Sequence, residues 1–142
     1  MMISEYGDEY MPRRATKNSA GYDFYSPVDM NCTPINVGVA GYYKIDTGIS
    51  LEDGDLQDDE VMLLFPRSSL GMKYGFSLAN TVGVIDADYR DTIKLAFMID
   101  HNILTIKKGD RIMQGVIVKF GKIPGEIAPA DVRNGGIGST GV

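Results

Sequence analysis

Short apolar runs, broken by glycine and proline, follow one another along most of the chain. Residues 61–65 are continuously apolar and end at Pro66, a pattern typical of a buried strand, whereas residues 20–25 alternate between apolar and polar positions. Similar runs predict further strands at residues 34–39, 42–45, 47–51, 82–86, 92–98, 103–106 and 111–120, with a last short strand between Pro124 and Pro129. Roughly ten short strands at regular spacing predict an all-β fold of the jelly-roll or sandwich kind.

One stretch, residues 68–75, favours a short helix, with Ser68 or Ser69 as its N-cap and Gly75 as its stop. The chain has 142 residues, enough for one hydrophobic core, and contains no internal repeat. We therefore expect a single domain over residues 1–132. Residues 133–142 are rich in glycine and have nothing to pack, so they are expected to form a separate flexible arm.

The charge and composition exclude several classes of protein. The net charge is −5 and the pI about 4.7, which argues against binding along a nucleic-acid backbone. No run approaches the roughly 18 apolar residues of a membrane span, and the acidic residues 1–10 do not resemble a secretory signal. The single cysteine, Cys32, cannot form an internal disulfide, so the expected location is the cytoplasm, or the host cytoplasm for a viral protein. The single histidine, His101, has no nucleophile beside it and fits a surface loop.

The stretch 80–90 is the first candidate for chemistry. Apolar residues lead into Asp86, a polar corner with Tyr89 follows, and an apolar run returns, which predicts a β-hairpin with a carboxylate at its mouth. An aspartate at a turn commonly just accepts hydrogen bonds from its own backbone. The stretch alone therefore fits either a catalytic carboxylate or a turn residue.

The arm contains Gly136-Ile137-Gly138-Ser139-Thr140-Gly141, which matches GxGxxG. A dinucleotide-binding site needs a helix after this motif, and only Val142 follows it in this sequence, so a dinucleotide-binding interpretation fails. Glycines still allow backbone N–H groups to converge on a phosphate, and Ser139, Thr140 and Arg133 add donors. From composition alone, a disordered end fits these residues equally well.

Three other places could bind an anion or hold a buried charge. Arg67-Ser68-Ser69 stands where a strand ends and the short helix begins, which favours an anion but also fits helix capping. Asp110 and Arg111 could form an ion pair. Asp23 lies in the first core strand, where an inward carboxylate needs a partner.

Five segments taken together resemble, in order, the five motifs of the homotrimeric dUTP diphosphatase (dUTPase) family. They are Ala20-Gly21-Tyr22-Asp23, Pro66-Arg67-Ser68-Ser69-Leu70, Asn80 with Gly83-Val84-Ile85-Asp86-Ala87-Asp88-Tyr89, Gly109-Asp110-Arg111-Ile112-Met113-Gln114, and Arg133 with Gly135-Gly136-Ile137-Gly138-Ser139-Thr140-Gly141. The resemblance runs from Arg13 to the last residue. It implies a jelly-roll-like β-barrel and a homotrimer with shared active sites. It also implies Mg²⁺-dependent hydrolysis of dUTP to dUMP and pyrophosphate, which limits uracil in DNA and supplies dUMP for dTTP synthesis.

The resemblance implies a role for each residue of the nucleoside pocket. Asp86 would be the general base that activates water, and Tyr89 would pack on the deoxyribose and leave no room for a 2′-hydroxyl. Asn80 would pair with the uracil edge, since an amide offers both a donor and an acceptor. Main-chain groups of Gly83, Val84 and Ile85, and others near Lys94, would complete the pocket.

The resemblance also implies how the phosphates would be bound. Arg67, Ser68 and Ser69 would act from a neighbouring subunit, Gln114 would contact the α-phosphate, and Asp23 would orient waters on Mg²⁺. Asp110 and Arg111 would brace the site. The arm would close over the nucleotide, with Arg133, Ser139 and Thr140 on the γ-phosphate; Ile137, beside Gly138, replaces the family's usual aromatic residue and would cap the uracil. The family also often has glycine where this chain has Asp91.

Two alternatives remain open at this point. A dCTP deaminase shares the fold and the opening Ala20-Gly21-Tyr22-Asp23, although the segment 83–86 and the glycine-rich arm favour the diphosphatase. A regulatory protein gated by nucleotide could also keep the fold, and the acidic loop 52–60 would be the place to seek its protein partner.

Overall fold

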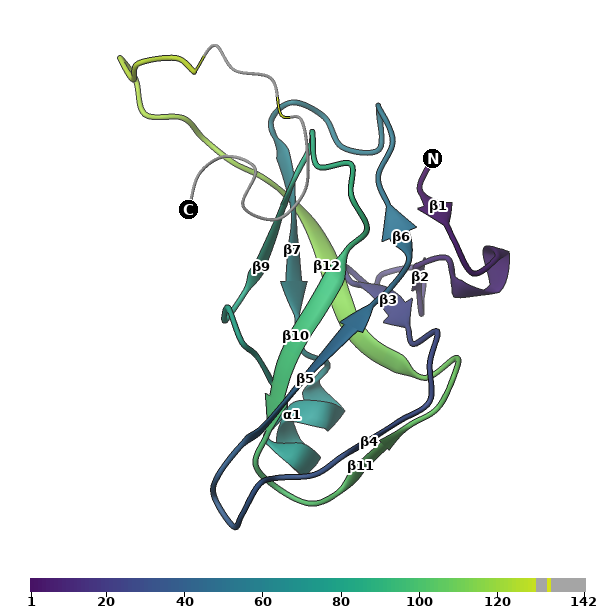
Figure 1. Cartoon of the computed structure of the whole chain (residues 1–142). Helices are drawn as coiled ribbons and strands as arrows, with labels where there is room; N and C mark the ends of the chain where they lie inside the picture. The colour runs from purple at the N-terminus through teal and green to yellow at the C-terminus, as the bar shows by residue number, and fades with distance from the viewer. Residues whose placement is uncertain (130–132, 134–142) are drawn as a thin grey trace.

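The computed structural model describes residues 1–129 and Arg133. Strands and short loops dominate it (Figure 1). The strands are β1 (Ile3–Ser4), β2 (Arg13–Arg14), β3 (Tyr22–Tyr25), β4 (Met30–Cys32), β5 (Gly41–Asp46), β6 (Ile49–Ser50), β7 (Glu60–Phe65), β8 (Ser77–Leu78), β9 (Gly83–Asp86), β10 (Lys94–Ile99), β11 (Leu104–Ile106) and β12 (Arg111–Lys119). The helices are a 3₁₀ turn, η1 (Asp8–Tyr10), and α1 (Ser68–Tyr74).

All the ladders are antiparallel. The largest sheet has five strands in the order β2-β3-β12-β7-β9, and a second sheet has the order β5-β10-β8. Two short ladders, β11-β4 and β1-β6, complete the set. This mostly β, jelly-roll-like arrangement confirms the fold class predicted from the sequence.

One hydrophobic core joins the two main sheets. Phe24, Met62 and Met113 of the five-stranded sheet belong to the same buried cluster as Leu95 and Phe97 of β10. The alternation of apolar and polar residues turns one face of each sheet toward this core. The cluster therefore fixes how the loops between the two sheets are placed.

The short helix is confirmed, but its N-cap was predicted wrongly. The N-cap is Arg67, in extended conformation and without a side-chain capping bond, so neither Ser68 nor Ser69 caps the helix. Both serines lie inside the first turn, where their hydroxyls remain available to other partners. Gly75 ends the helix in the left-handed conformation (φ 60°), as the sequence predicted.

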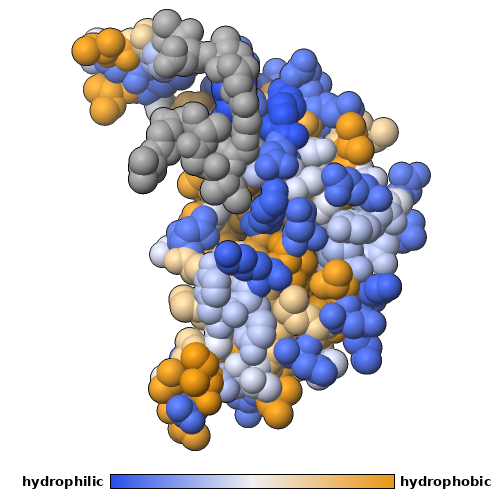
Figure 2. All heavy atoms as spheres, viewed as in Figure 1, coloured by the Kyte–Doolittle hydropathy of each residue, from blue (hydrophilic) through white to orange (hydrophobic). Residues whose placement is uncertain are grey.

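Two predicted strands are absent from the described residues. Residues 34–39 form a turn with one isolated bridge between Asn36 and Val39, because Gly38 (φ 74°) reverses the chain. Residues 124–129 form a turn at Gly125 (φ 79°) and then a loop without regular structure. The exposed apolar side chains of the first turn lie at the lower end of the molecule in Figure 2, and include Ile35, Val37 and Val39.

The predicted hairpin over residues 82–98 is also wrong. β9 pairs with β7 in the five-stranded sheet, whereas β10 pairs with β5 and β8 in the other sheet. Each strand turns a buried apolar face to the shared core, Ile85 from one sheet and Leu95 from the other. The loop 87–93 therefore crosses from one sheet to the other, and Asp86 and Tyr89 lie where the sheets part.

Cys32 is fully buried in β4, and burial raises the pKa of its thiol to about 11. At pH 8 the thiolate fraction would be about one thousandth. We therefore expect no reaction of the native protein with a chromogenic disulfide reagent, and complete reaction in guanidinium. Rapid labelling of the native protein would contradict this packing.

No helix among the described residues is long and apolar enough to cross a membrane.

Candidate active site

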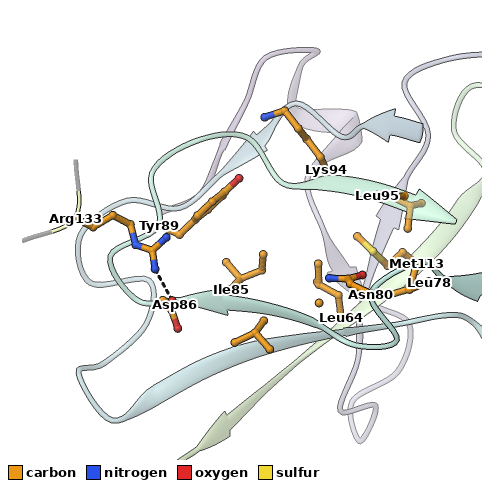
Figure 3. A pocket seen from close by; sticks show the side chains of 13 residues that line it. Leu64, Leu78, Asn80, Ile85, Asp86, Tyr89, Lys94, Leu95, Met113 and Arg133 are labelled. Atoms are coloured by element: carbon orange, nitrogen blue, oxygen red, sulfur yellow. Dashed lines mark hydrogen bonds and ion pairs between the residues drawn. The ribbon is translucent and has the colours of Figure 1, made fainter. Parts of the chain in front are cut away.

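A cavity of about 330 Å³ opens where the two main sheets part. Its walls come from β9 and the loop after it on one side and from β10 on the other, with Leu64, Leu78 and Met113 at its base. Figure 3 shows Asn80 among apolar side chains at one end, and Asp86 with Arg133 at the opposite end. The cavity thus has an apolar end with an amide and a charged end with a carboxylate.

Asp86 is the last residue of β9, and its side chain is half exposed at the charged end. An Nη2–Oδ2 distance of 2.5 Å joins Arg133 to Asp86, and Arg133 Nε donates to Asp88 at 2.9 Å. The Arg133 guanidinium also lies 5.8 Å from the centre of the Tyr89 ring. The structure therefore brings together Asp86, Tyr89 and Arg133, three of the candidate residues named from the sequence.

Tyr89 forms a fixed wall beside Asp86. Only 6% of the residue is exposed, and its hydroxyl donates to the Thr92 carbonyl at 3.0 Å. Burial raises the pKa of this phenol above its ordinary value, so the ring is neutral at neutral pH. The ring is held by its burial in the core and by the hydrogen bond of its hydroxyl. It therefore presents a rigid apolar surface to the cavity.

The backbone of β9 is available for recognition. β9 is the outermost strand of its sheet and pairs only with β7, so one row of its N–H and C=O groups is not used by the sheet. A Cβ on Gly83 would lie 2.8 Å from the Leu64 side chain, so only glycine fits at this position. Gly83, Val84 and Ile85 line the cavity together with Asn80.

Lys94 lines the cavity from the first position of β10, but its ammonium group is engaged elsewhere. It donates to Thr92 Oγ1 at 3.0 Å and to Asp91 at 3.2 Å, and lies 3.9 Å from Asp46. Partial burial lowers the pKa of Lys94, but the Asp91 hydrogen bond and the Asp46 charge outweigh it and raise the pKa overall. The ammonium is therefore a structural cation of the loop.

Sequence reasoning missed the ion pair between Arg90 and the acidic loop. Arg90 donates to the carbonyls of Ala87 and Tyr89 and pairs with Asp53 of the loop 52–60. The N-terminal ammonium group of Met1 also pairs with this loop, at 3.1 Å from Asp55 Oδ1. The loop thus supports the crossing loop of the active site, and these carboxylates have partners within the chain.

A second cavity, of about 350 Å³, contains several of the residues predicted to bind phosphate and is called the phosphate cavity below. Asp23, Arg67, Ser68 and Gln114 line it, and Asp23 lies opposite Gln114 in the β3–β12 ladder. Gln114 Nε2 donates to the Pro66 carbonyl at 3.2 Å, which joins β12 to the start of the Arg67 turn. Ser69 does not line this cavity and faces another one beside α1.

Asp23 is nearly buried and is shared by two guanidinium groups. Arg67 Nε lies 3.2 Å from one carboxylate oxygen and Arg111 Nη1 lies 3.6 Å from the other. Asp110 does not form the predicted pair with Arg111; it accepts instead from the backbone N–H of Lys107 at 2.9 Å. Within the described part of the chain, no three acidic, histidine or cysteine side chains gather as a metal site.

The Asp86 cavity and the phosphate cavity share no lining residue. A single chain therefore joins Asp86 to Arg133, but it places Arg67, Ser68 and Gln114 in a different cavity from Asp86. His101 lies exposed beside Asp100 in a loop, as expected, and in neither cavity. Ile137, Gly138, Ser139 and Thr140 lie outside the described residues.

A family model for dUTPase matches residues 8–141. The chain belongs to the dUTPase family. This match decides the choice between dUTPase and dCTP deaminase that the sequence had left open. The five segments singled out by sequence reasoning all lie within the matched range.

Curated relatives agree with this assignment. The deoxyuridine 5′-triphosphate nucleotidohydrolase of Rickettsia conorii is 37% identical over 137 residues, covering 93% of this chain and 88% of that protein. The enzyme of the same name from Neorickettsia sennetsu is 34% identical over 146 residues, covering 99% of this chain and 94% of the relative.

Solved dUTPase structures share the fold. The crystal structure of the Streptococcus mutans dUTPase is 31% identical, with a TM-score of 0.71 over 88% of this chain and 98% of that one. A dUTPase from phage phi11 of S. aureus, which coordinates a structural Mg(II) ion, is 20% identical with a TM-score of 0.70. The aligned region covers 94% of this chain and 98% of the phage protein. At 20% identity, this match shows similarity of fold alone.

Proposed function

We propose that this protein hydrolyses dUTP to dUMP and pyrophosphate, and so limits uracil incorporation into DNA and supplies dUMP for dTTP synthesis. The observation that carries the proposal is the position of Asp86. Its carboxylate ends an outermost strand at the mouth of a cavity whose other end is apolar and holds an amide, Asn80. A nucleoside bound along this cavity would place its phosphates beside Asp86.

Asp86 would act as the general base. A half-exposed carboxylate is able to accept a proton from a water molecule that attacks the α-phosphorus. The new bond forms between that water oxygen and the α-phosphorus, and the bond from the α-phosphorus to the bridging oxygen breaks. The electron pair leaves with pyrophosphate, and the proton passes to Asp86.

The apolar end of the cavity would select the base and the sugar. The Asn80 amide and the unused edge of β9 at Gly83–Ile85 together offer donors and acceptors to the uracil edge. The Tyr89 ring, held by packing and by its bond to Thr92, would lie against the deoxyribose and exclude a 2′-hydroxyl. Main-chain groups near Lys94 would close the other wall.

We propose that three chains share three active sites. Asp86 of one chain would face Arg67, Ser68, Ser69 and Gln114 of a neighbour, because these residues lie in separate cavities of a single chain. Gln114 would contact the α-phosphate, and Arg67 with the serines would contact the outer phosphates. The Asp23 carboxylate would hold the Arg67 guanidinium in position.

Shared sites predict that two inactive variants restore one another. Arg67→Gln and Asp86→Asn proteins, unfolded together and refolded, would form mixed trimers in which some sites have both residues intact. We expect the mixture to recover at least about a tenth of wild-type activity, whereas each variant alone stays near background. Recovery would be measured as pyrophosphate release. A mixture no more active than its components would place the whole site in one chain.

The residues of the phosphate cavity fit a Mg²⁺ ion held mainly by the nucleotide. Asp23 is the one carboxylate that lines this cavity, and Mg²⁺ prefers one or two carboxylates with water and substrate phosphates. Asp23 would orient waters on the ion. When bound, Mg²⁺ would neutralise phosphate charge, while Asp23 continues to pair with Arg67 and Arg111.

Residues 133–142 form the proposed arm, separate from the barrel at 1–132. Arg133, Ser139 and Thr140 would bind the γ-phosphate, and Ile137 with Gly138 would cover the base. The position of Arg133 at the charged end of the cavity supports this. A single buried thiol, Cys32, suits the reducing cytoplasm that we propose as the location.

The test of the proposed function is pyrophosphate release from dUTP, dCTP, dTTP and UTP with Mg²⁺ present. We expect dUTP alone to be hydrolysed efficiently, and removal of Mg²⁺ by chelator to reduce the rate strongly. Ammonia release from dCTP, or equal rates with all four nucleotides, would overturn the proposal.

Tyr89→Ala is expected to weaken discrimination between dUTP and UTP. Loss of the ring opens space beside the sugar, so the ratio of kcat/KM values should fall about tenfold or more. Because Tyr89 is buried, its removal also lowers stability, so Tyr89→Phe serves as the matched control: it keeps the ring and loses only the bond to Thr92. An unchanged dUTP/UTP ratio in Tyr89→Ala would remove this role.

A further inference from the structure

A third cavity, of about 300 Å³, lies between α1 and the junction of β11 with β12. It shares only Arg67 with the phosphate cavity and nothing with the Asp86 cavity. The roles given above to dUTP-binding residues leave most of it unused. Its polar lining consists of three cations, three hydroxyls and one carboxylate.

The lining of this cavity is positively charged, whereas the chain as a whole is negatively charged. Arg67, Lys73 and Arg111 line it against one acid, Asp110, although the net charge of the protein is −5. The Asp110 carboxylate already accepts from the Lys107 backbone at 2.9 Å. The nearest positive groups therefore exceed the negative ones, which favours an anionic ligand.

Two of the three cations are fixed by a carboxylate that does not line the cavity. Asp23 pairs with Arg67 through Nε and with Arg111 through Nη1, so other N–H groups of both guanidiniums remain for a ligand. The Lys73 ammonium pairs with no carboxylate within residues 1–129 and Arg133. Its helix is anchored instead through the backbone, where Asn102 Nδ2 donates to the Lys73 carbonyl at 2.9 Å.

Hydroxyl groups complete the lining. Ser69, Tyr74 and Thr105 reach the cavity from α1 and β11. In the part of the chain that the structure describes, none of these three hydroxyls hydrogen-bonds to another protein group. Two guanidinium groups, one ammonium group and three available hydroxyl donors match the many acceptor oxygens of a phosphate group.

We propose that this cavity is a second anion site that binds inorganic pyrophosphate. Its volume suits a small oligophosphate, and the surplus of donors suits an anion rich in acceptor oxygens. Arg67 lines both cavities, and Ser69 lines this one while also being proposed to contact the nucleotide, so pyrophosphate and the nucleotide phosphates compete for the same donors. Each ligand therefore weakens the other by the same factor. The site goes beyond the proposed function, since pyrophosphate in it undergoes no reaction.

The test is a calorimetric titration of pyrophosphate into the full chain saturated with a non-hydrolysable α,β-imido analogue of dUTP. With the nucleotide site filled, we expect one remaining pyrophosphate site per chain. Lys73→Gln should weaken it about tenfold or more, as expected for a lost charge-assisted hydrogen bond, and Thr105→Val by a smaller factor. Lys122→Gln, which removes an exposed lysine outside the cavity, should bind as the wild type does.

The proposal would be overturned if the saturated protein bound no pyrophosphate. It would also be overturned if Lys73→Gln and Thr105→Val both bound pyrophosphate as tightly as the wild type. Thermal melts of the variants establish that each is folded. The result is separable from dUTP hydrolysis. A chain that fails to bind the analogue but binds pyrophosphate through Lys73 would reject the proposed function and keep the anion site.

Discussion

Asp86→Asn is expected to lower the rate of pyrophosphate release from dUTP by about a hundred- to ten-thousandfold, the usual contribution of a general base. The amide has nearly the shape of the carboxylate and can still hold a water molecule, but it cannot take that water's proton. Binding of the imido analogue should remain within a fewfold of wild type, because Asp86 lies at the charged end of the cavity and the base binds at the other. Steady-state release and calorimetry measure the two effects separately.

Asp88→Asn is the matched control for that experiment. It makes the same chemical change two residues away, in a carboxylate that also contacts Arg133 but does not line the cavity. A much smaller loss than that of Asp86→Asn is expected. Full activity of Asp86→Asn would show that Asp86 is not the general base. Equal losses in the two variants would show that the charge of the loop matters and that Asp86 has no special role.

The fold class was predictable from the sequence because strand signals are local. Alternation and apolar runs located β3, β5, β7, β10 and β12 to within a residue or two. The partner of each strand is not a local property. Residues 82–98 looked like a hairpin because two apolar runs flank a polar corner, yet the loop 87–93 crosses between sheets, since both strands bury a face in the same core.

The sequence named candidate residues for the site but not how they are arranged. The motif resemblance named Asp86, Tyr89 and Arg133, and the structure brings them together. Pairing across long sequence distances was missed, as with Asp53 and Arg90, or Asp23 and Arg111. Charges that attract one another carry no periodic signal, and any of several acidic residues could have served each arginine.

Which cavity each serine of this segment faces also lay beyond the sequence. Arg67, Ser68 and Ser69 are consecutive, yet Ser68 faces the phosphate cavity and Ser69 faces the cavity proposed for pyrophosphate. Successive residues of a helix point about 100° apart, so a helical turn at this position separates them. Only the register of α1, which starts after Arg67, determines which serine faces which cavity.

Removal of residues 133–142 is expected to lower turnover of dUTP by about a hundredfold, comparable to the loss of one strong transition-state hydrogen bond. Arg133 places a guanidinium on Asp86 and Asp88, with only 12% of its side chain exposed. When a triphosphate enters, its oxygens would compete with these carboxylates for the arginine. The Asp86 carboxylate would then be released to act on water, and the arginine would bind the γ-phosphate.

This exchange predicts how two arm variants differ. Arg133→Gln keeps the other arm residues and loses only the cation, so most of the fall in kcat should already occur in this single substitution. Ile137→Phe, which restores the aromatic residue usual in the family, should lower KM for dUTP and leave kcat nearly unchanged, since a ring can stack on uracil without touching the phosphates. Both are measured by pyrophosphate release against dUTP concentration. A truncated chain with wild-type kcat and KM would mean that residues 133–142 take no part in the reaction, and that the bond from Arg133 to Asp86 is only structural.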